Sequence, residues 1–507
     1  MKKTALIIMI ITLFSKFFGF GRDIVLSYFF GASSISDAYL ISLTVPSVLF
    51  GLIGNGIVTA YIPTQSRIIE DSGEAAGSEF TSNFTNLILI IISIILLFGL
   101  VFTEQIVKLF ALGFSGEVLE LTIKFTQISF WGMYFTALIS IFSGYLQIKN
   151  NYIIPTLIGF PFNIIIVISI IISSNGNYNI LAFGTLLATA SQFFLIALFV
   201  KKEKFNYSLY LNLRDDRVIK TLFIALPVII GTSVNQVNTL VDRTIASSLA
   251  LGGISALNYA NRLNLFIQGL FVTSVITAMY PMISSYASKQ NYEGIKIALR
   301  ESIIIITIFV LPMSIGAMLF SNQVVSLLFG RGAFDDSAIK MTSSALFFYS
   351  FGMLGFAYRE VLARGYYSMQ DTKTPMINAS MGLILNIILN IVLSRILGIG
   401  GLALATSIAA MCTSLLLFFS LRKKIGPFGI KQISISFIKI LFASLIMGGL
   451  AKLSYNYLAT SLSQNLSLLL AIGTGAVSYF VIIFFMRIED VDVIVNAIKM
   501  KFGKAVG

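Results

Sequence analysis

The chain has 507 residues, of which 57% are hydrophobic and only 11% are charged, and its formal net charge is +13. A soluble domain carries about 25% charged residues, so this chain cannot cover a water-facing surface. The single cysteine, Cys412, excludes a disulfide framework, and the absence of histidine removes the commonest metal ligand and proton shuttle. We therefore expect a membrane protein with no metal site and no enzyme active site.

The apolar residues form blocks long enough to cross a bilayer, which takes roughly 20 residues each. In chain order the blocks are 5–30, 36–62, 82–103, 121–146, 153–174, 178–200, 219–249, 255–286, 302–320, 338–366, 375–396, 399–421, 434–457 and 464–486. They predict an all-α polytopic membrane protein with about fourteen transmembrane helices.

Basic residues gather in every second loop between the blocks, as in the group Lys201, Lys202 and Lys204. The positive-inside rule then places both termini in the cytoplasm, and an even number of helices satisfies it. We expect a multi-pass protein of the bacterial inner membrane, and no nucleic-acid partner, because the basic residues lie where topology signals lie.

An internal repeat relates the two halves of the chain. The segment TAYIP at 59–63 recurs as TAMYP at 277–281, Gly-Met at 132–133 recurs at 352–353, and Gly-Tyr at 144–145 recurs at 365–366. Each shift is close to 220 residues, which indicates two parallel six-helix copies related by an axis along the membrane normal. We predict a first lobe at 1–200, a cytoplasmic linker at 201–220, a second lobe at 221–421, two further helices at 434–486 and a cytoplasmic tail at 487–507.

Charged and amide side chains fall inside the apolar blocks, where each charge costs about 2.5–3.5 kcal/mol at the bilayer centre and so indicates a function. They occupy the first two helices of each predicted lobe: Lys16, Arg22, Asp23, Asp37, Asn235, Asn238, Asp242, Arg243, Asn258, Asn261 and Arg262. Helical spacing stacks Asn238 under Asp242, and Asn258 under Arg262. We predict that these side chains line a polar, net-cationic cavity, with Asp23, Asn235, Asn238, Asp242, Arg243, Asn258 and Asn261 as polar or gating groups.

Two interpretations of the adjacent pairs Arg22-Asp23 and Asp242-Arg243 stay open, because structural ion pairs near helix ends have the same sequence signature. Arg262 differs, since no acidic residue lies within a helical turn of it. A guanidinium in a cavity suits a phosphate, which it can bind through two parallel hydrogen bonds. We expect no cofactor and no ATP, because the chain has no GxxxxGK[ST] segment, and a membrane potential or a gradient of H⁺ or Na⁺ as the energy source.

Three motifs resemble those of the MurJ (MviN) lipid II flippases: SKFFGFGRDIVLSYFFGASSISDA at 15–38, NYANRLNLF at 258–266 with Tyr-Pro at 280–281, and GYYSMQDTKTP at 365–375. The resemblance covers nearly the whole chain. It implies a MOP-type exporter fold with two V-shaped lobes, and alternating access that carries undecaprenyl-diphosphate-linked muropeptide to the outer leaflet. It also implies that the last two helices form a groove for the lipid tail.

The resemblance assigns substrate binding to Arg22, Asp37, Arg262 and Ser15, with Lys16 where the family often has an arginine. Phe50, Gly51 and Asn55 stand where the family often has charges, and Glu360 occupies an often basic position. Fewer cations leave open a flippase for another polyprenyl-linked glycan, and a drug or cation antiporter of the same fold. We expect lipid II and bilayer lipids as partners, contacts with cell-wall synthesis proteins, and a monomer.

Overall fold

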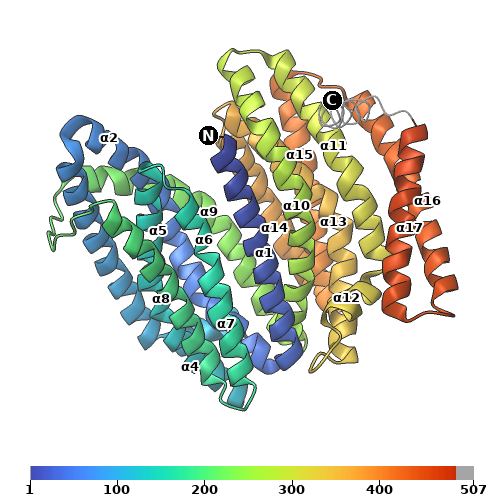
Figure 1. Ribbon diagram of the computed structural model, residues 1–507, viewed down its shortest axis with the longest axis horizontal. Coiled ribbons are helices and arrows are strands. Elements are labelled where there is room, and N and C mark those ends of the chain that lie inside the picture. Colours follow the sequence, from blue (N-terminus) through green and yellow to red (C-terminus); the bar gives the residue numbers. More distant parts are fainter. Residues whose placement is uncertain (1, 487–507) are drawn as a thin grey trace. The chain divides into compact units, whose positions relative to one another are not determined.

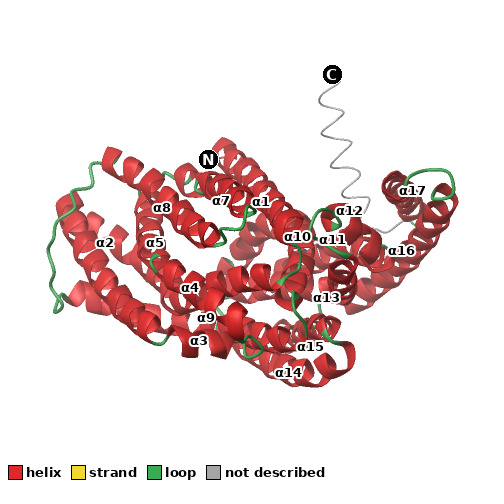
Figure 2. Cartoon of the chain, turned by 90° about the horizontal axis from the view of Figure 1, so that it is seen from below, coloured by secondary structure: helices red, strands yellow, loops and turns green. Residues whose placement is uncertain are grey.

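The structure, a computed structural model, describes residues 2–486, without the side chains at positions 2–6, 52, 53, 55, 58, 227, 228, 230–232, 234 and 235. The predicted tail at 487–507 lies outside the described residues, as do the side chains of Asn55 and Asn235. Helices joined by loops make up the described part of the chain (Figure 2). The all-α prediction is therefore confirmed.

By internal contacts the chain divides into two compact units, residues 1–255 with 331–338, and residues 256–330 with 339–507. The first unit holds the helices that precede residue 250: α1 (Lys2–Phe30), α2 (Ser34–Val101), α3 (Thr103–Phe110), α4 (Gly116–Phe130), α5 (Gly132–Ile148), α6 (Ile153–Leu157), α7 (Gly159–Ser173), α8 (Asn179–Lys202) and α9 (Asp216–Leu249) (Figure 1).

The second unit holds most of α10 (Gly253–Ser288) and α13 (Asp336–Ser368), whose first residues belong to the first unit. Its other helices are α11 (Tyr292–Leu319), α12 (Ser321–Phe329), α14 (Lys373–Leu397), α15 (Ile399–Ile425), α16 (Ile430–Leu458) and α17 (Gln464–Phe485). The short helices α3 and α12 lie outside the predicted blocks, because helices of this length are too short to give a transmembrane signal.

Within the described residues, eleven segments are long and apolar enough to cross a membrane. The three predicted blocks outside this set, 5–30, 219–249 and 338–366, coincide with the long helices α1, α9 and α13. Every block predicted from the sequence therefore falls on a helix. Predicted helices two and three form a single element, α2, which is interrupted at Gly73.

The two halves of α2 form an antiparallel hairpin around Gly73. Gly73 has φ 81° and ψ 176°, a conformation that glycine adopts without steric cost. Across the hairpin, the hydroxyls of Tyr61 and Thr81 lie 2.8 Å apart, and the Gln65 side-chain amide donates to the Gly77 carbonyl at 3.1 Å. Each half contains a segment that is long and apolar enough to cross a bilayer.

Residues of the internal repeat occupy similar environments in the two units. The side chains at all three repeated positions are buried: Tyr61 and Met279, Met133 and Met353, Tyr145 and Tyr366. Equivalent burial supports the repeat, because a chance sequence match need not place both residues in a core.

Helix α9 is the first helix of the predicted second lobe, and it packs on α2 in the first unit. The helices approach closely at Gly56, where an added Cβ would lie 2.5 Å from the Ile229 side chain. Contacts and sequence repeat thus divide the chain at different points. A lobe defined by the repeat begins at α9, whereas the second compact unit begins at Ala256.

Candidate substrate-binding site

Helix α1 brings an arginine and an aspartate together in its second half. The Arg22 guanidinium donates to one carboxylate oxygen of Asp23 through Nε at 3.1 Å and Nη2 at 2.8 Å. The side chain of Arg22 is 17% exposed and that of Asp23 is 5% exposed. The ion pair expected as one of two interpretations is therefore present.

The part of α1 around Ser15 and Gly19 packs on the helices that follow Asn151. The Ser15 hydroxyl lies 2.1 Å from the point where a Cβ on Gly159 would stand, so a larger residue there would require the Ser15 side chain to move. One turn on, buried Asn163 faces Gly19 and donates to the Gly159 carbonyl at 2.7 Å. Ser15 therefore faces a helix contact, whereas Lys16, the next residue, is exposed.

Asp37 lies in the first turn of α2 and is almost fully buried. One carboxylate oxygen accepts hydrogen bonds from the backbone N–H and the hydroxyl of Ser255, both at 2.7 Å. The other, Oδ2, is buried and accepts no hydrogen bond from the described residues. The carboxylate thus ties the beginning of α2 to the beginning of α10.

The predicted polar face of α9 is present along its described side chains. The Asn238 amide donates to Asp242 at 3.3 Å, which is the stacking expected one helical turn apart. The Arg243 Nη1 donates to the Ile254 carbonyl at 3.0 Å. These side chains are half-buried, and Arg243 ties α9 to the loop before α10.

Asn258, Asn261 and Arg262 lie on α10 in the second unit. Arg262 is exposed, and the two asparagines are half-buried. One turn after Asn261, buried Asn264 accepts a hydrogen bond from Gln268 at 3.0 Å. Sequence reasoning missed this pair, although its spacing of one turn was a usable signal. Whether Arg22 and Arg262 share one cavity stays a prediction.

The second unit contains an apolar cavity of about 430 Å³. Its walls come from six helices, α10, α11, α12, α13, α16 and α17, and include Leu263, Phe266, Pro312, Gly316, Met447 and Phe480. The single hydroxyl in this lining, that of Tyr479, donates to the Ile308 carbonyl at 2.6 Å and is thereby satisfied. Helices α16 and α17, which lie outside the sequence repeat, contribute one wall, and the cavity suits a hydrocarbon chain.

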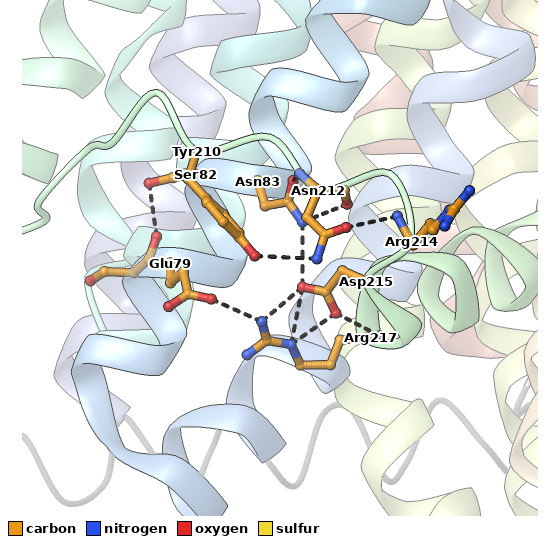
Figure 3. A network of polar contacts seen from close by, with 9 residues as sticks. Glu79, Ser82, Asn83, Tyr210, Asn212, Arg214, Asp215 and Arg217 are labelled. Atoms are coloured by element: carbon orange, nitrogen blue, oxygen red, sulfur yellow. Dashed lines mark hydrogen bonds and ion pairs between the residues drawn. The ribbon is translucent and has the colours of Figure 1, made fainter.

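Polar side chains also hold the loop between α8 and α9 against α2, a feature the sequence did not reveal (Figure 3). The Arg217 guanidinium donates to Asp215 at 2.7 Å and to Glu79 at 3.2 Å. The hydrogen bonds from Arg217 lower the pKa of Asp215 below its ordinary value, and those from Asp215 raise the pKa of Arg217. Both groups are therefore charged at neutral pH.

Solved structures of two kinds share this fold. One, described as "Lipid II flippase MurJ, inward closed conformation", is 29% identical, has a TM-score of 0.83, and is matched over 95% of this chain and 99% of its own. A multidrug resistance MATE family transporter of the MOP superfamily, in an inward-facing conformation, is 16% identical, with a TM-score of 0.70 over 83% of this chain and 98% of its own. The class is thus a polytopic transporter with the MOP-type fold.

The sequence comparisons identify the family within this class of transporter. The family model "Lipid II flippase MurJ" matches residues 26–474. A "Probable lipid II flippase MurJ" of Buchnera aphidicola subsp. Baizongia pistaciae is 30% identical over 82% of each chain, and one of Vibrio cholerae is 26% identical over 97% of each. A "Lipid II flippase MurJ" of Burkholderia cenocepacia is 26% identical over 87% of each. The chain belongs to the MurJ family of lipid II flippases.

Proposed function

We propose that the protein moves lipid II, the undecaprenyl-diphosphate-linked muropeptide, from the inner to the outer leaflet of the bacterial cytoplasmic membrane. The observation that carries the proposal is the match to the solved lipid II flippase over 95% of the chain. The protein is a transporter without enzymatic activity. It acts as a monomer with both termini in the cytoplasm, in contact with cell-wall synthesis proteins.

In this proposal Arg22 and Arg262 bind the diphosphate. A diphosphate cannot cross hydrocarbon unaided, because an isolated charge in a low-dielectric medium costs tens of kcal/mol by Born solvation. Arginine offsets this cost with paired, charge-assisted hydrogen bonds. The membrane potential or a gradient of H⁺ or Na⁺ supplies the energy, and the protein passes through alternating inward-open and outward-open states.

The lipid tail occupies the apolar cavity of the second unit. A cavity of about 430 Å³ is smaller than an undecaprenyl chain, so it holds part of the tail while the remainder stays in the bilayer. In this arrangement the role of α16 and α17 is to contact the lipid tail, because the polar headgroup passes elsewhere and only the hydrocarbon remains beside them.

Genetic complementation tests the proposal. Cells depleted of their own lipid II flippase should resume growth when this chain is expressed, and lipid II should stop accumulating in the inner leaflet. A control strain that lacks a flippase for another polyprenyl-linked glycan tests the main alternative, which is that this chain transports that glycan. Rescue of that control strain, with no rescue of the depleted cells, would contradict the proposal.

A MATE-type antiporter is the second candidate, and only the shared fold favours it. Uptake of cationic dyes into vesicles discriminates the two. The lipid II flippase proposal expects the same dye distribution with and without the protein.

A further inference from the structure

The loop between α8 and α9 carries a group of exposed apolar and aromatic side chains. They are Tyr207 at 49%, Leu209 at 88%, Tyr210 at 40%, Leu211 at 44% and Leu213 at 59%. The three leucines stand at every second position, which is the spacing of side chains on one side of an extended segment. We call residues 207–213 the interface strap.

Hydrogen bonds of the residues beside the leucines attach the strap to α2, and the first is from the Tyr207 hydroxyl to the Asn86 side-chain oxygen at 2.5 Å. The Ser208 N–H donates to the Ser82 hydroxyl at 3.2 Å. Asn86 donates to the carbonyls of Ser208 and Tyr210 at 3.2 and 2.9 Å.

Asn83 bonds both backbone groups of Asn212: its carbonyl oxygen accepts from the N–H at 2.8 Å, and its amide donates to the C=O at 3.1 Å. The strap is therefore fixed on a transmembrane helix with its leucines facing away from it.

Both ends of the strap are anchored within the first unit. Before it, the Phe205 ring lies 5.7 Å from that of Phe142 and 5.2 Å from that of Tyr145. After it, the Asp215 and Arg217 pair holds the beginning of α9 against Glu79. Figures 1 and 2 show this loop at the periphery of the first unit, with no helix of that unit outside it.

The attachment points fix the depth of the strap in the membrane. Beyond Gly73, the first exposed large apolar side chain of α2 is Ile90, followed by Ile94 and Leu97, so the hydrocarbon begins near Ile90. Asn86 lies one turn before Ile90 and Ser82 two turns before it, which is about 6 and 12 Å at 1.5 Å per residue. The headgroup layer on each side of the hydrocarbon is about 5–8 Å thick. The strap is thus held within and just above the headgroups.

Charge near the strap complements an anionic surface. Lys201, Lys202, Lys204 and Arg214 are exposed beside it. Carboxylates are present too: Asp215 and Glu79 bind Arg217, and Glu74 binds Lys149, while Glu203 and Asp216 offset part of the basic charge. Basic side chains close to an anionic leaflet contribute about 1 kcal/mol each to its attraction.

We propose that the interface strap is a membrane-surface anchor. In this arrangement Leu209, Leu211 and Leu213 insert into the boundary between headgroups and acyl chains, and the neighbouring basic residues contact anionic headgroups. The occupant is phospholipid of the leaflet that the basic loops assign to the cytoplasm. Apolar side chains at this depth are stabilised by burial among lipids, whereas in water they would form an exposed apolar patch. The anchor fixes the beginning of α9 relative to the bilayer, whatever the transported substrate is.

Tryptophan fluorescence in vesicles tests the anchor. The native Trp131 is removed by Trp131→Phe, and one reporter is introduced by Leu209→Trp. The matched control is Ser72→Trp, at an exposed position beside Gly73 in the turn of the α2 hairpin. Each protein is reconstituted in phosphatidylglycerol and phosphatidylethanolamine, with a share of the lipid brominated in the upper acyl chain.

We expect the brominated lipid to quench the Leu209→Trp reporter about twofold or more relative to the Ser72→Trp reporter, as for a side chain at the acyl boundary. Replacing phosphatidylglycerol by phosphatidylcholine should weaken this quenching. Leu213→Trp provides a second reporter if the first variant does not fold.

Equal quenching of the two reporters would overturn the proposal. So would emission from Leu209→Trp that is shielded from aqueous acrylamide but unaffected by brominated lipid, because that result places a second protein copy or another protein over the strap.

Discussion

The carboxylate of Asp37 accepts two hydrogen bonds from Ser255, one from its backbone N–H and one from its hydroxyl, both at 2.7 Å. The two residues begin different transmembrane helices, α2 and α10, and both are buried. One short side chain therefore fixes where two long helices meet.

Asp37→Ala should destabilise the first unit more than Ser255→Ala does. The first variant leaves the buried Ser255 backbone N–H without its acceptor, and such a loss costs about 1–3 kcal/mol, whereas the Ser255 hydroxyl can still donate to the Gly252 carbonyl at 3.0 Å. The second removes only the hydroxyl donor, and the backbone N–H keeps its bond. Thermal unfolding in detergent measures both. Equal midpoints for the two variants would show that the hydroxyl bond carries the whole contribution.

Arg262→Ala should abolish complementation while the protein remains folded, and Arg262→Lys should restore only part of it. Lysine supplies a point charge without the planar fork that binds two phosphate oxygens. Lys16→Ala should cause a smaller loss, because a lysine supplies only a point charge at this position. Expression and size-exclusion profiles are compared at matched levels. Full activity of Arg262→Ala would refute the assigned role.

Gly316→Leu should impair transport by filling the apolar cavity. A Cβ at Gly316 meets no atom within 4 Å, so the larger side chain can enter the cavity without displacing the backbone. Gly473→Leu is the matched control: its Cβ is equally unobstructed, and this residue is absent from the cavity lining. Complementation and thermal stability are measured for both. A similar loss in the two variants would indicate a general effect of leucine at helical glycines.

The attachment of α9 should weaken in acid. Because Arg217 lowers the pKa of Asp215 in the folded state, the ionised pair stabilises the fold above the ordinary aspartate pKa of 3.8 and is lost as the pH falls through the lowered value. Asp215→Asn should remove this acid dependence and keep the N-cap of α9, whereas Asp215→Ala should also lose the cap, at about 1 kcal/mol. Hydrogen exchange of residues 206–217 across pH 2–5, corrected for intrinsic rates, follows the change. An identical pH profile in the native chain and Asp215→Asn would contradict the pairing.

The sequence by itself determined the positions of the helices and the class of protein. A bilayer demands apolar segments of a set length, so the fourteen blocks can be counted without knowing any contact. It also determined which side chains are costly in a membrane. Apolar runs are interrupted by Arg22, Asp37, Asp242 and Arg262, and the cost of these charges does not depend on how the helices pack. The family motifs lie among these same residues.

Only the tertiary structure decided the partners of these side chains. Arg22 binds the adjacent Asp23, and Arg243 donates to the Ile254 carbonyl eleven residues further on, a partner that adjacency in sequence does not predict. Asp37 meets Ser255, and Asn83 meets Asn212, across more than a hundred residues of chain. Serines and asparagines such as Ser82, Asn83 and Asn86 give no signal in a sequence, since their hydrogen bonds can go to water, to their own helix or to a distant loop with nearly equal energy. Packing alone selects among these partners, and here it fastens the interface strap to α2.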